Sequence, residues 1–227
     1  MVSYKQAPEQ QPRRRRARNS LTRPEIVVAA REVLKDGGIG AFTIRAVADR
    51  LGASAMSLYN HVESKEDVLD AALDSLLLEL RLSDDPARPA ADVLVEYAEQ
   101  HLAHLQANRW AIPALFRRPD PGPGAALVGE AYFATALRGG ADPQTAVDIF
   151  TGVIAIIYGA AGFLGSEGDS QQTREEIAET IAQVPLPATA SVAEPLAAYG
   201  DDAQVHRILT ALIHGLLPRQ PGVAPRT

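Results

Sequence analysis

The chain has 227 residues, with 22 Lys and Arg against 28 Asp and Glu, and it contains no cysteine. The lack of cysteine excludes disulfide bonds, thiolate metal ligands and a cysteine nucleophile. Ala, Leu, Val and Ile dominate and aromatic residues are few, which favours an all-helical fold of one large or two small domains. The basic N-terminus has no signal-like apolar stretch, and the longest apolar run, 153–165, is too short to cross a bilayer. We therefore expect a soluble cytoplasmic protein without membrane contact.

Charge is unevenly distributed along the chain. Residues 1–62 hold eleven Lys and Arg and five Asp and Glu, whereas residues 63–227 hold eleven and twenty-three. An acidic protein thus contains a basic N-terminal part. Binding to a polyanion explains this pattern, and so does a basic tail that has no partner.

The first twenty residues are polar, contain prolines and show no periodicity, which predicts a disordered arm. The arm carries five arginines: Arg13, Arg14, Arg15, Arg16 and Arg18. After it, Thr22-Arg-Pro-Glu25 forms a capping box that starts a first helix, and Gly37-Gly38 is expected to end it.

Three more helix starts follow closely. Thr43 caps a short second helix that Gly52 ends, and Ser54 caps a third helix that reaches about His61. Ser64 opens a long fourth helix over residues 64–82. The second and third helices, joined by a four-residue turn at 51–54, have the layout of a helix-turn-helix.

The third helix divides into two faces. Leu58 and Val62 are expected to pack inward, against the rest of the domain. Small, hydroxylated and aromatic side chains remain outward, and this mixture suits a DNA groove and its phosphates. These outward residues are Ser54, Ala55, Met56, Ser57, Tyr59, Asn60 and His61. The alternative is that Tyr59 and His61 only cover the packing between helices.

The stretch TIRAVADRLGASAMSLYNHVESKEDVLDAAL resembles the DNA-binding region of the TetR family of bacterial repressors, over about residues 22–80. The most specific part is the LYxHV…K pattern from Leu58 to Lys65. The resemblance implies a repressor, not an enzyme, that binds a pseudo-palindromic operator in double-stranded DNA and is released by a small-molecule effector. It also implies that Arg45 reaches a base edge and that phosphates are contacted by Thr43, Tyr59, His61 and Lys65.

The interpretation divides the chain into an Arg-rich arm (1–20), a helix-turn-helix DNA-binding domain (21–66), a helical ligand-binding and dimerisation domain (67–218) and a flexible tail (219–227). The third part is expected to contain helices at about 90–107, 111–117, 123–138, 143–166 and 202–217, with a loop-like stretch at 167–200. Residues 146–165 and 205–217 are apolar on nearly every side, so they must be buried on every side. The resemblance implies that they pair with their copies as a four-helix bundle in a C2 homodimer. Burial within one monomer is the alternative.

Polar and aromatic residues of this domain are candidates for an effector pocket that accepts a hydrophobic or aromatic compound, either an antibiotic-like compound or a metabolite. They are Tyr97, His101, His104, Trp110, Phe116, Tyr132, Phe133, Phe150 and Tyr158. No cofactor is expected. The Arg-rich arm either enters a minor groove or acts as an electrostatic tether.

Two other functions remain as alternatives. His101 and His104 share a helical face, which suggests a helical enzyme or a metal-dependent sensor, although no third ligand is apparent. Some relatives bind a metal-chelated drug through a histidine in this region, so a metal-chelated effector is a further hypothesis. A helical adaptor whose arm binds RNA or membrane is the other alternative, and the Tyr-x-His spacing argues against it.

Overall fold

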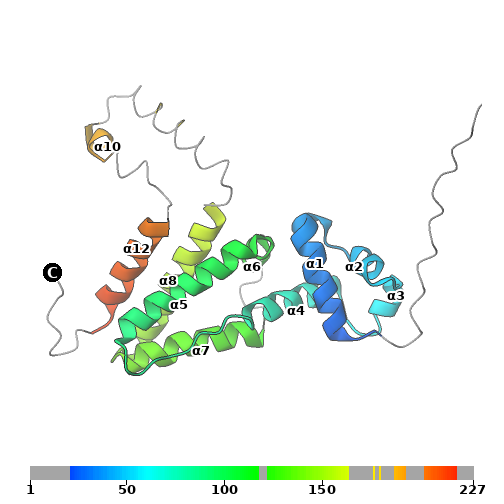
Figure 1. Ribbon diagram of the computed structural model, residues 1–227, viewed down its shortest axis with the longest axis horizontal. Coiled ribbons are helices and arrows are strands. Elements are labelled where there is room, and N and C mark those ends of the chain that lie inside the picture. The colour runs from blue at the N-terminus through cyan, green and yellow to red at the C-terminus, as the bar shows by residue number, and fades with distance from the viewer. Residues whose placement is uncertain are drawn as a thin grey trace, which may run out of the picture. The chain divides into compact units, whose positions relative to one another are not determined.

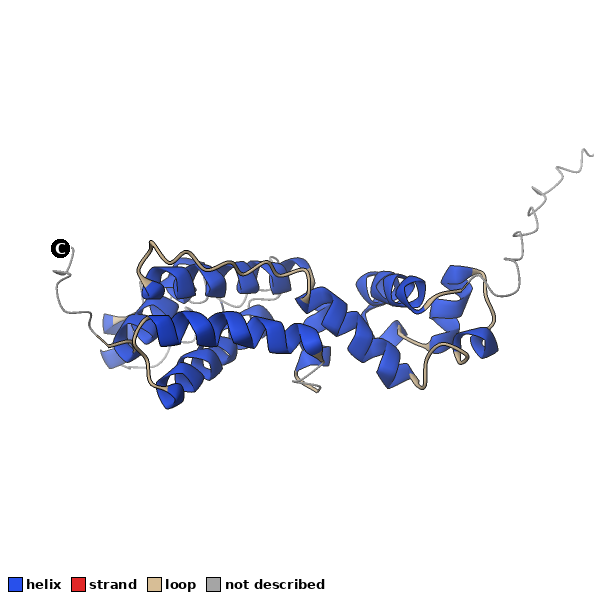
Figure 2. Ribbon diagram, turned by 90° about the horizontal axis from the view of Figure 1, so that it is seen from below, coloured by secondary structure: helices blue, strands red, loops and turns tan. Residues whose placement is uncertain are grey.

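The computed structural model describes residues 21–117, 122–163, 176, 179, 187–192 and 202–218. Every regular element in these ranges is helical (Figures 1 and 2), which confirms the predicted all-α class. The chain divides into two compact units, of which the first ends at Ala72 and the second begins at Leu73. The predicted arm (1–20), the tail (219–227) and most of the loop-like stretch 167–200 lie outside the described residues.

The first unit contains α1 (Arg23–Ala41), α2 (Ile44–Leu51), α3 (Ala55–Leu58) and the start of α4 (Lys65–Leu77). Its helix starts follow the sequence closely. The Thr22 hydroxyl accepts from the Glu25 N–H while the Glu25 carboxylate accepts from the Thr22 N–H, which is the predicted capping box. The predicted stop at Gly37-Gly38 is a kink within α1, where Gly38 has a φ of 64°.

Two helix ends differ from the prediction. The third helix was expected to reach His61, but α3 ends at Leu58, and the N–H groups of His61 and Val62 both bond to the Leu58 carbonyl. The fourth helix was expected to reach residue 82, but α4 ends at Leu77. After it, the Leu80 N–H bonds to the Leu77 carbonyl, a tighter i to i+3 turn that stops the α-helical pattern.

The second unit contains α5 (Ala90–Ala107), η1 (Arg109–Ala111), α6 (Ile112–Leu115), α7 (Pro123–Arg138), α8 (Pro143–Phe163), α10 (Pro187–Ser191) and α12 (Asp202–Leu216). Helix α5 packs against α7, α8 and α12, and α8 packs against α6, α7 and α12 (Figure 1). In place of the predicted helix at 111–117, the structure has η1 followed by the short helix α6. Pro113 lies in the first turn of α6, where its missing N–H is tolerated.

Helix α8 is more extensive than its apolar run suggested. Residues 143–162 are long and apolar enough to cross a membrane by length and composition, which corrects the expectation drawn from 153–165. Such a composition is also typical of a core helix. Ile149, Val153 and Ile157 of α8 are fully buried, and the helix contacts four others of its unit. One face of α8 is therefore covered by its own unit, as in a core helix.

Candidate functional sites

The inward face of the helix-turn-helix has the predicted composition. Leu58 of α3 is completely buried, and Val62 in the following segment is nearly so. Val47 and Ala48 of α2 are buried as well, and α2 packs against both α1 and α3. This packing fixes the orientation of α3, so its remaining side chains point away from the core.

The opposite face of α3 carries large exposed side chains. Met56 is 75% exposed and Tyr59 is 50% exposed, although both are apolar or aromatic. Ser54 and Asn60 are exposed, and the predicted contacts Ala55, Ser57 and His61 are half-buried. Because α3 ends at Leu58, Tyr59 is the C-cap residue, and Asn60 and His61 lie in the turn that follows the helix. An exposed Met and Tyr on one short face indicate a surface that meets a partner.

Two hydroxyl groups fix the helix starts at this surface. The Thr43 Oγ1 atom accepts from the Ala46 N–H at 3.0 Å, and the Ser54 Oγ atom accepts from the Ser57 N–H at 3.1 Å. Each hydroxyl uses an oxygen lone pair for the cap and keeps its proton for donation. The same residues can therefore cap α2 and α3 and donate to a phosphate.

An ion pair holds the segment after α3 in place. The Arg23 guanidinium donates to both carboxylate oxygens of Asp67, at 2.5 and 2.9 Å, and to the His61 carbonyl at 3.3 Å. Asp67 also accepts from the Glu63 N–H at 2.9 Å. The Arg23 hydrogen bond lowers the pKa of Asp67, so the carboxylate stays charged. Sequence reasoning missed Arg23, since 44 residues separate it from Asp67.

The two arginines of α2 have different surroundings. Arg50 pairs with Glu32 at 3.4 Å and with Asp36, both on α1. Arg45 is exposed and lies on the opposite flank of the helix, five residues earlier. Lys65, another predicted phosphate contact, lies with its ammonium 5.6 Å from the centre of the Phe42 ring.

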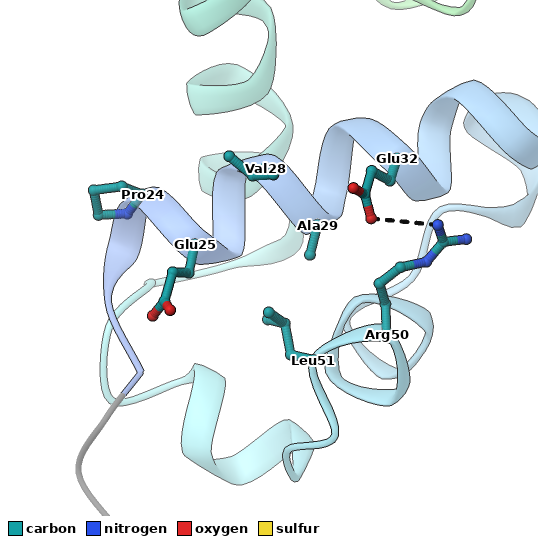
Figure 3. A pocket seen from close by; sticks show the side chains of 7 residues that line it. All are labelled: Pro24, Glu25, Val28, Ala29, Glu32, Arg50 and Leu51. Atoms are coloured by element: carbon teal, nitrogen blue, oxygen red, sulfur yellow. Dashed lines mark hydrogen bonds and ion pairs between the residues drawn. The ribbon is translucent and has the colours of Figure 1, made fainter. Parts of the chain in front are cut away.

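A shallow pocket lies between α1 and the end of α2, with a volume of about 390 Å³ (Figure 3). It is lined by Pro24, Glu25, Val28, Ala29, Glu32, Arg50 and Leu51. The Arg50–Glu32 pair crosses one end of it. None of these residues belongs to the predicted DNA contacts, so this pocket is separate from the exposed face of α3.

In the second unit, most of the predicted pocket residues are joined by ring contacts. Tyr97 of α5 meets Tyr132 of α7 edge-on at 5.6 Å, and Tyr132 meets Phe150 of α8 at 5.6 Å. Phe150 in turn contacts Phe133 at 5.0 Å. A second chain of contacts joins His101 to Tyr158 and Tyr158 to Phe116, each at 6.2 Å. We call these seven residues the aromatic cluster.

Two polar groups in the aromatic cluster are buried without a hydrogen-bond partner among the described residues. They are both ring nitrogens of His101 and the hydroxyl of Tyr132. Burial lowers the pKa of His101 to about 4, with a smaller contribution from His104, and burial raises the pKa of Tyr132. Both side chains are therefore neutral at pH 7. Unpaired polar atoms inside a core are uncommon, and a bound water or ligand can supply the missing partner.

Two predicted pocket residues, His104 and Trp110, lie outside the aromatic cluster, and a third, Phe116, is at its exposed edge. The His104 ring bonds to the Leu76 carbonyl at 2.9 Å, which ties α5 to the last turn of α4. Trp110 is buried but makes no ring contact with the aromatic cluster among the described residues. Phe116 is 62% exposed, although its ring reaches Tyr158. No group of three or more His, Asp or Glu in the described part of the chain is arranged to hold a metal, so His101 and His104 gain no third ligand there.

A second contact joins the last turn of α4 to another helix of this unit. The Asp74 carboxylate accepts from the Gly124 N–H at the start of α7. A Cβ atom at Gly124 would lie 2.6 Å from the Asp74 carbonyl oxygen, so only glycine allows this approach. The end of α4 is therefore hydrogen-bonded to two helices: to α5, which carries His101, through His104, and to α7, which carries Tyr132, through Gly124. Sequence reasoning did not find Asp74 or Gly124.

Comparison with known proteins agrees with this arrangement. The family model described as bacterial regulatory proteins of the TetR family matches residues 26–72. An uncharacterized HTH-type transcriptional regulator of Mycobacterium tuberculosis is 32% identical over 160 residues, which cover 65% of this chain and 70% of the relative. The chain belongs to the TetR family. The family consists of transcriptional regulators, so the alternative of a helical enzyme is discarded.

A second relative, an HTH-type transcriptional regulator of Saccharopolyspora erythraea, is 36% identical over 125 residues, or 55% of this chain. The match spans about half, 53%, of that relative's length. Among solved structures, ActR of Streptomyces coelicolor in complex with actinorhodin aligns with a TM-score of 0.79 at 22% identity, over 87% of this chain and 96% of ActR. The TetR fold therefore extends through the second unit.

Proposed function

We propose that this TetR-family protein is a repressor that binds a pseudo-palindromic operator as a C2 homodimer and leaves it when a small molecule occupies the second unit. The observation that carries the proposal is the exposed face of α3, where Met56 and Tyr59 point outward while Leu58 anchors the helix. The caps at Thr43 and Ser54 present hydroxyl donors beside this face. These groups suit apolar contacts to thymine methyls and hydrogen bonds to phosphates.

Exposed apolar residues on α8 and α12 support the dimer. On α12, the buried face is formed by Val205, Leu209 and Ile213, whereas Ile208 is 46% exposed and Leu216 is exposed as well. Among the described residues, one flank of this apolar helix is therefore uncovered, which supports pairing with a copy over burial within one chain. Val147 of α8 is also exposed. Pairing α8 and α12 with their copies in a four-helix bundle covers these residues and places two α3 helices on successive half-sites.

The aromatic cluster supports a small-molecule effector. It combines apolar rings with two buried polar groups that lack partners among the described residues. Two related proteins agree with such a function: DrrR1 of Streptomyces coeruleorubidus is named a transcriptional repressor, and ActR is described in complex with actinorhodin. Ligand binding here would shift α5 and α7, and their bonds to Leu76 and Asp74 offer a route to α4.

The test of this proposal is a mobility shift with duplex DNA that flanks the protein's own gene. We expect tight, sequence-selective binding at physiological salt, and release by at least one compound from a small-molecule screen. Equal affinity for the flanking DNA, unrelated DNA and heparin would contradict the proposal and favour the polyanion-binding adaptor.

Arg45 is expected to read a base edge of the operator. Arg45→Ala should weaken operator binding by about 1–3 kcal/mol and relax the preference at one base pair of each half-site, because a bidentate contact to guanine is lost. Binding to a panel of single-base operator variants measures this. Arg50→Ala is the matched control, since Arg50 is on the same helix but pairs with Glu32 and Asp36. An equal loss on every operator variant would show instead that Arg45 contacts a phosphate.

The Arg-rich arm, outside the described residues, is expected to add phosphate contacts. Deletion of residues 1–18 should weaken operator binding and flatten the dependence of affinity on salt, since each lost contact removes about one unit of the slope. Titrations at several salt concentrations measure both. An unchanged slope would contradict a DNA role for the arm.

A further inference from the structure

We infer that the effector is an uncharged aromatic compound carrying hydroxyl and carbonyl groups, and that His101 and Tyr132 are the residues that select it. The inference rests on the proposed function, because it specifies the ligand of the same aromatic cluster. The composition of the second unit predicts a hydrophobic or aromatic ligand, and the buried polar atoms specify the groups that this ligand carries.

The two selecting residues lie on the packed helices α5 and α7, one in each chain of ring contacts. Tyr97 lies one helical turn before His101 on α5, and its ring contacts Tyr132 on α7 at 5.6 Å. His101 contacts Tyr158 of α8, and Tyr132 contacts Phe150 of the same helix. Three helices thus bring the polar groups of His101 and Tyr132 into one surrounding of aromatic rings. A planar aromatic body matches these rings by stacking and edge-on contacts.

The unpaired polar atoms of His101 and Tyr132 define which hydrogen-bonding groups the aromatic ligand must have. A neutral imidazole offers one donor and one acceptor, and a phenol offers a donor and an acceptor. None of these atoms has a partner among the described residues, whereas the Tyr97 hydroxyl accepts from the Thr135 hydroxyl at 3.4 Å. An unpaired buried group lowers stability, so a ligand with a carbonyl and a hydroxyl gains by completing both residues.

The described surroundings also favour an uncharged ligand. The buried polar residues of the described chain are His101 and Thr135, and no Lys, Arg, Asp or Glu is among them. His101 is itself neutral at pH 7 because burial lowers its pKa to about 4. A carboxylate, sulfonate or ammonium on the ligand would therefore meet no buried counter-charge among the described residues, which is unfavourable. A metal chelate would likewise find no buried Asp or Glu carboxylate among the described residues.

The test compares two probes of similar shape on the purified full-length protein at pH 7. Chrysazin is an uncharged dihydroxyanthraquinone, and anthraquinone sulfonate carries a fixed negative charge. We expect chrysazin to bind the wild-type protein at least about tenfold more tightly than the sulfonate, as measured by calorimetry. Tyr132→Phe and His101→Phe should each weaken chrysazin binding by about tenfold, since each removes hydrogen-bonding groups at nearly constant volume.

Thermal unfolding without ligand distinguishes a selecting residue from a structural one. Tyr132→Phe should raise the Tm, because it removes an unpaired buried hydroxyl. Tyr97→Phe is the matched control, and it should not raise the Tm because its hydroxyl has a partner in Thr135. If His101→Phe fails to fold, the Tyr132 variant still decides the outcome.

The inference is overturned if chrysazin does not bind, if the sulfonate binds equally well, or if both variants bind chrysazin as the wild type does. It is also overturned if Mg²⁺ is required for binding. Operator binding is measured separately by mobility shift. If the wild-type protein binds its operator selectively but does not bind chrysazin, the proposed function stands and only this inference fails. If the wild-type protein shows no selectivity for its operator, the proposed function itself is refuted.

Discussion

Replacing Ile208 with Glu is expected to convert the protein to a monomer and to weaken operator binding by about 10²–10⁴-fold. Ile208 lies on the exposed apolar flank of α12 and is 46% exposed. A carboxylate there would be desolvated without a counter-charge in a four-helix bundle. The loss in affinity follows because the second half-site is no longer bound intramolecularly.

Sedimentation or light scattering measures the oligomeric state, and a mobility shift measures operator affinity. Ala203→Glu is the matched control, since Ala203 is exposed in the first turn of the same helix, where an acidic residue is favourable. The control should remain dimeric. A dimeric Ile208→Glu protein would show that the C2 interface lies elsewhere.

Leu58→Ala is expected to lower the free energy of unfolding of the first unit by about 2–5 kcal/mol and to abolish operator binding. The Leu58 side chain is completely buried, and it is the buried residue of the four-residue helix α3. Its removal leaves a cavity between α3 and the rest of the helix-turn-helix. So short a helix has little stability of its own and depends on this packing.

Chemical denaturation monitored by circular dichroism measures the loss, and a mobility shift measures binding. Met56→Ala is the control on the same helix, because Met56 is largely exposed. It should leave stability nearly unchanged and weaken DNA binding only. If Leu58→Ala kept both properties, α3 would not be the anchored reading helix.

Local signals predicted the first unit well. The caps at Thr22, Thr43, Ser54 and Ser64 all form as expected, and Gly52 ends α2 in the left-handed conformation. Each of these features depends on residues within about one helical turn, so the sequence contains the whole interaction. Helix ends without such a signal were predicted less well, as at α4, which stops at Leu77 although apolar residues continue.

The candidate sites were predicted in part. The aromatic residues of the second unit were named from composition, but nothing in their spacing showed which would meet. The structure joins seven of the nine by ring contacts and separates His104, whose ring bonds to Leu76. The residues at the end of α4 escaped prediction for the same reason, because Asp74 and Gly124 are 50 residues apart in the chain.

By itself, the sequence determined the helical class, the helix-turn-helix and the outward composition of α3, since periodicity and caps act within a few residues. Only the tertiary structure decided which distant groups meet. It pairs Arg23 with Asp67 across 44 residues, and it leaves His101 and Tyr132 buried without partners. Burial and pairing depend on the surroundings that several helices create together, and these surroundings do not exist in any single stretch of the chain.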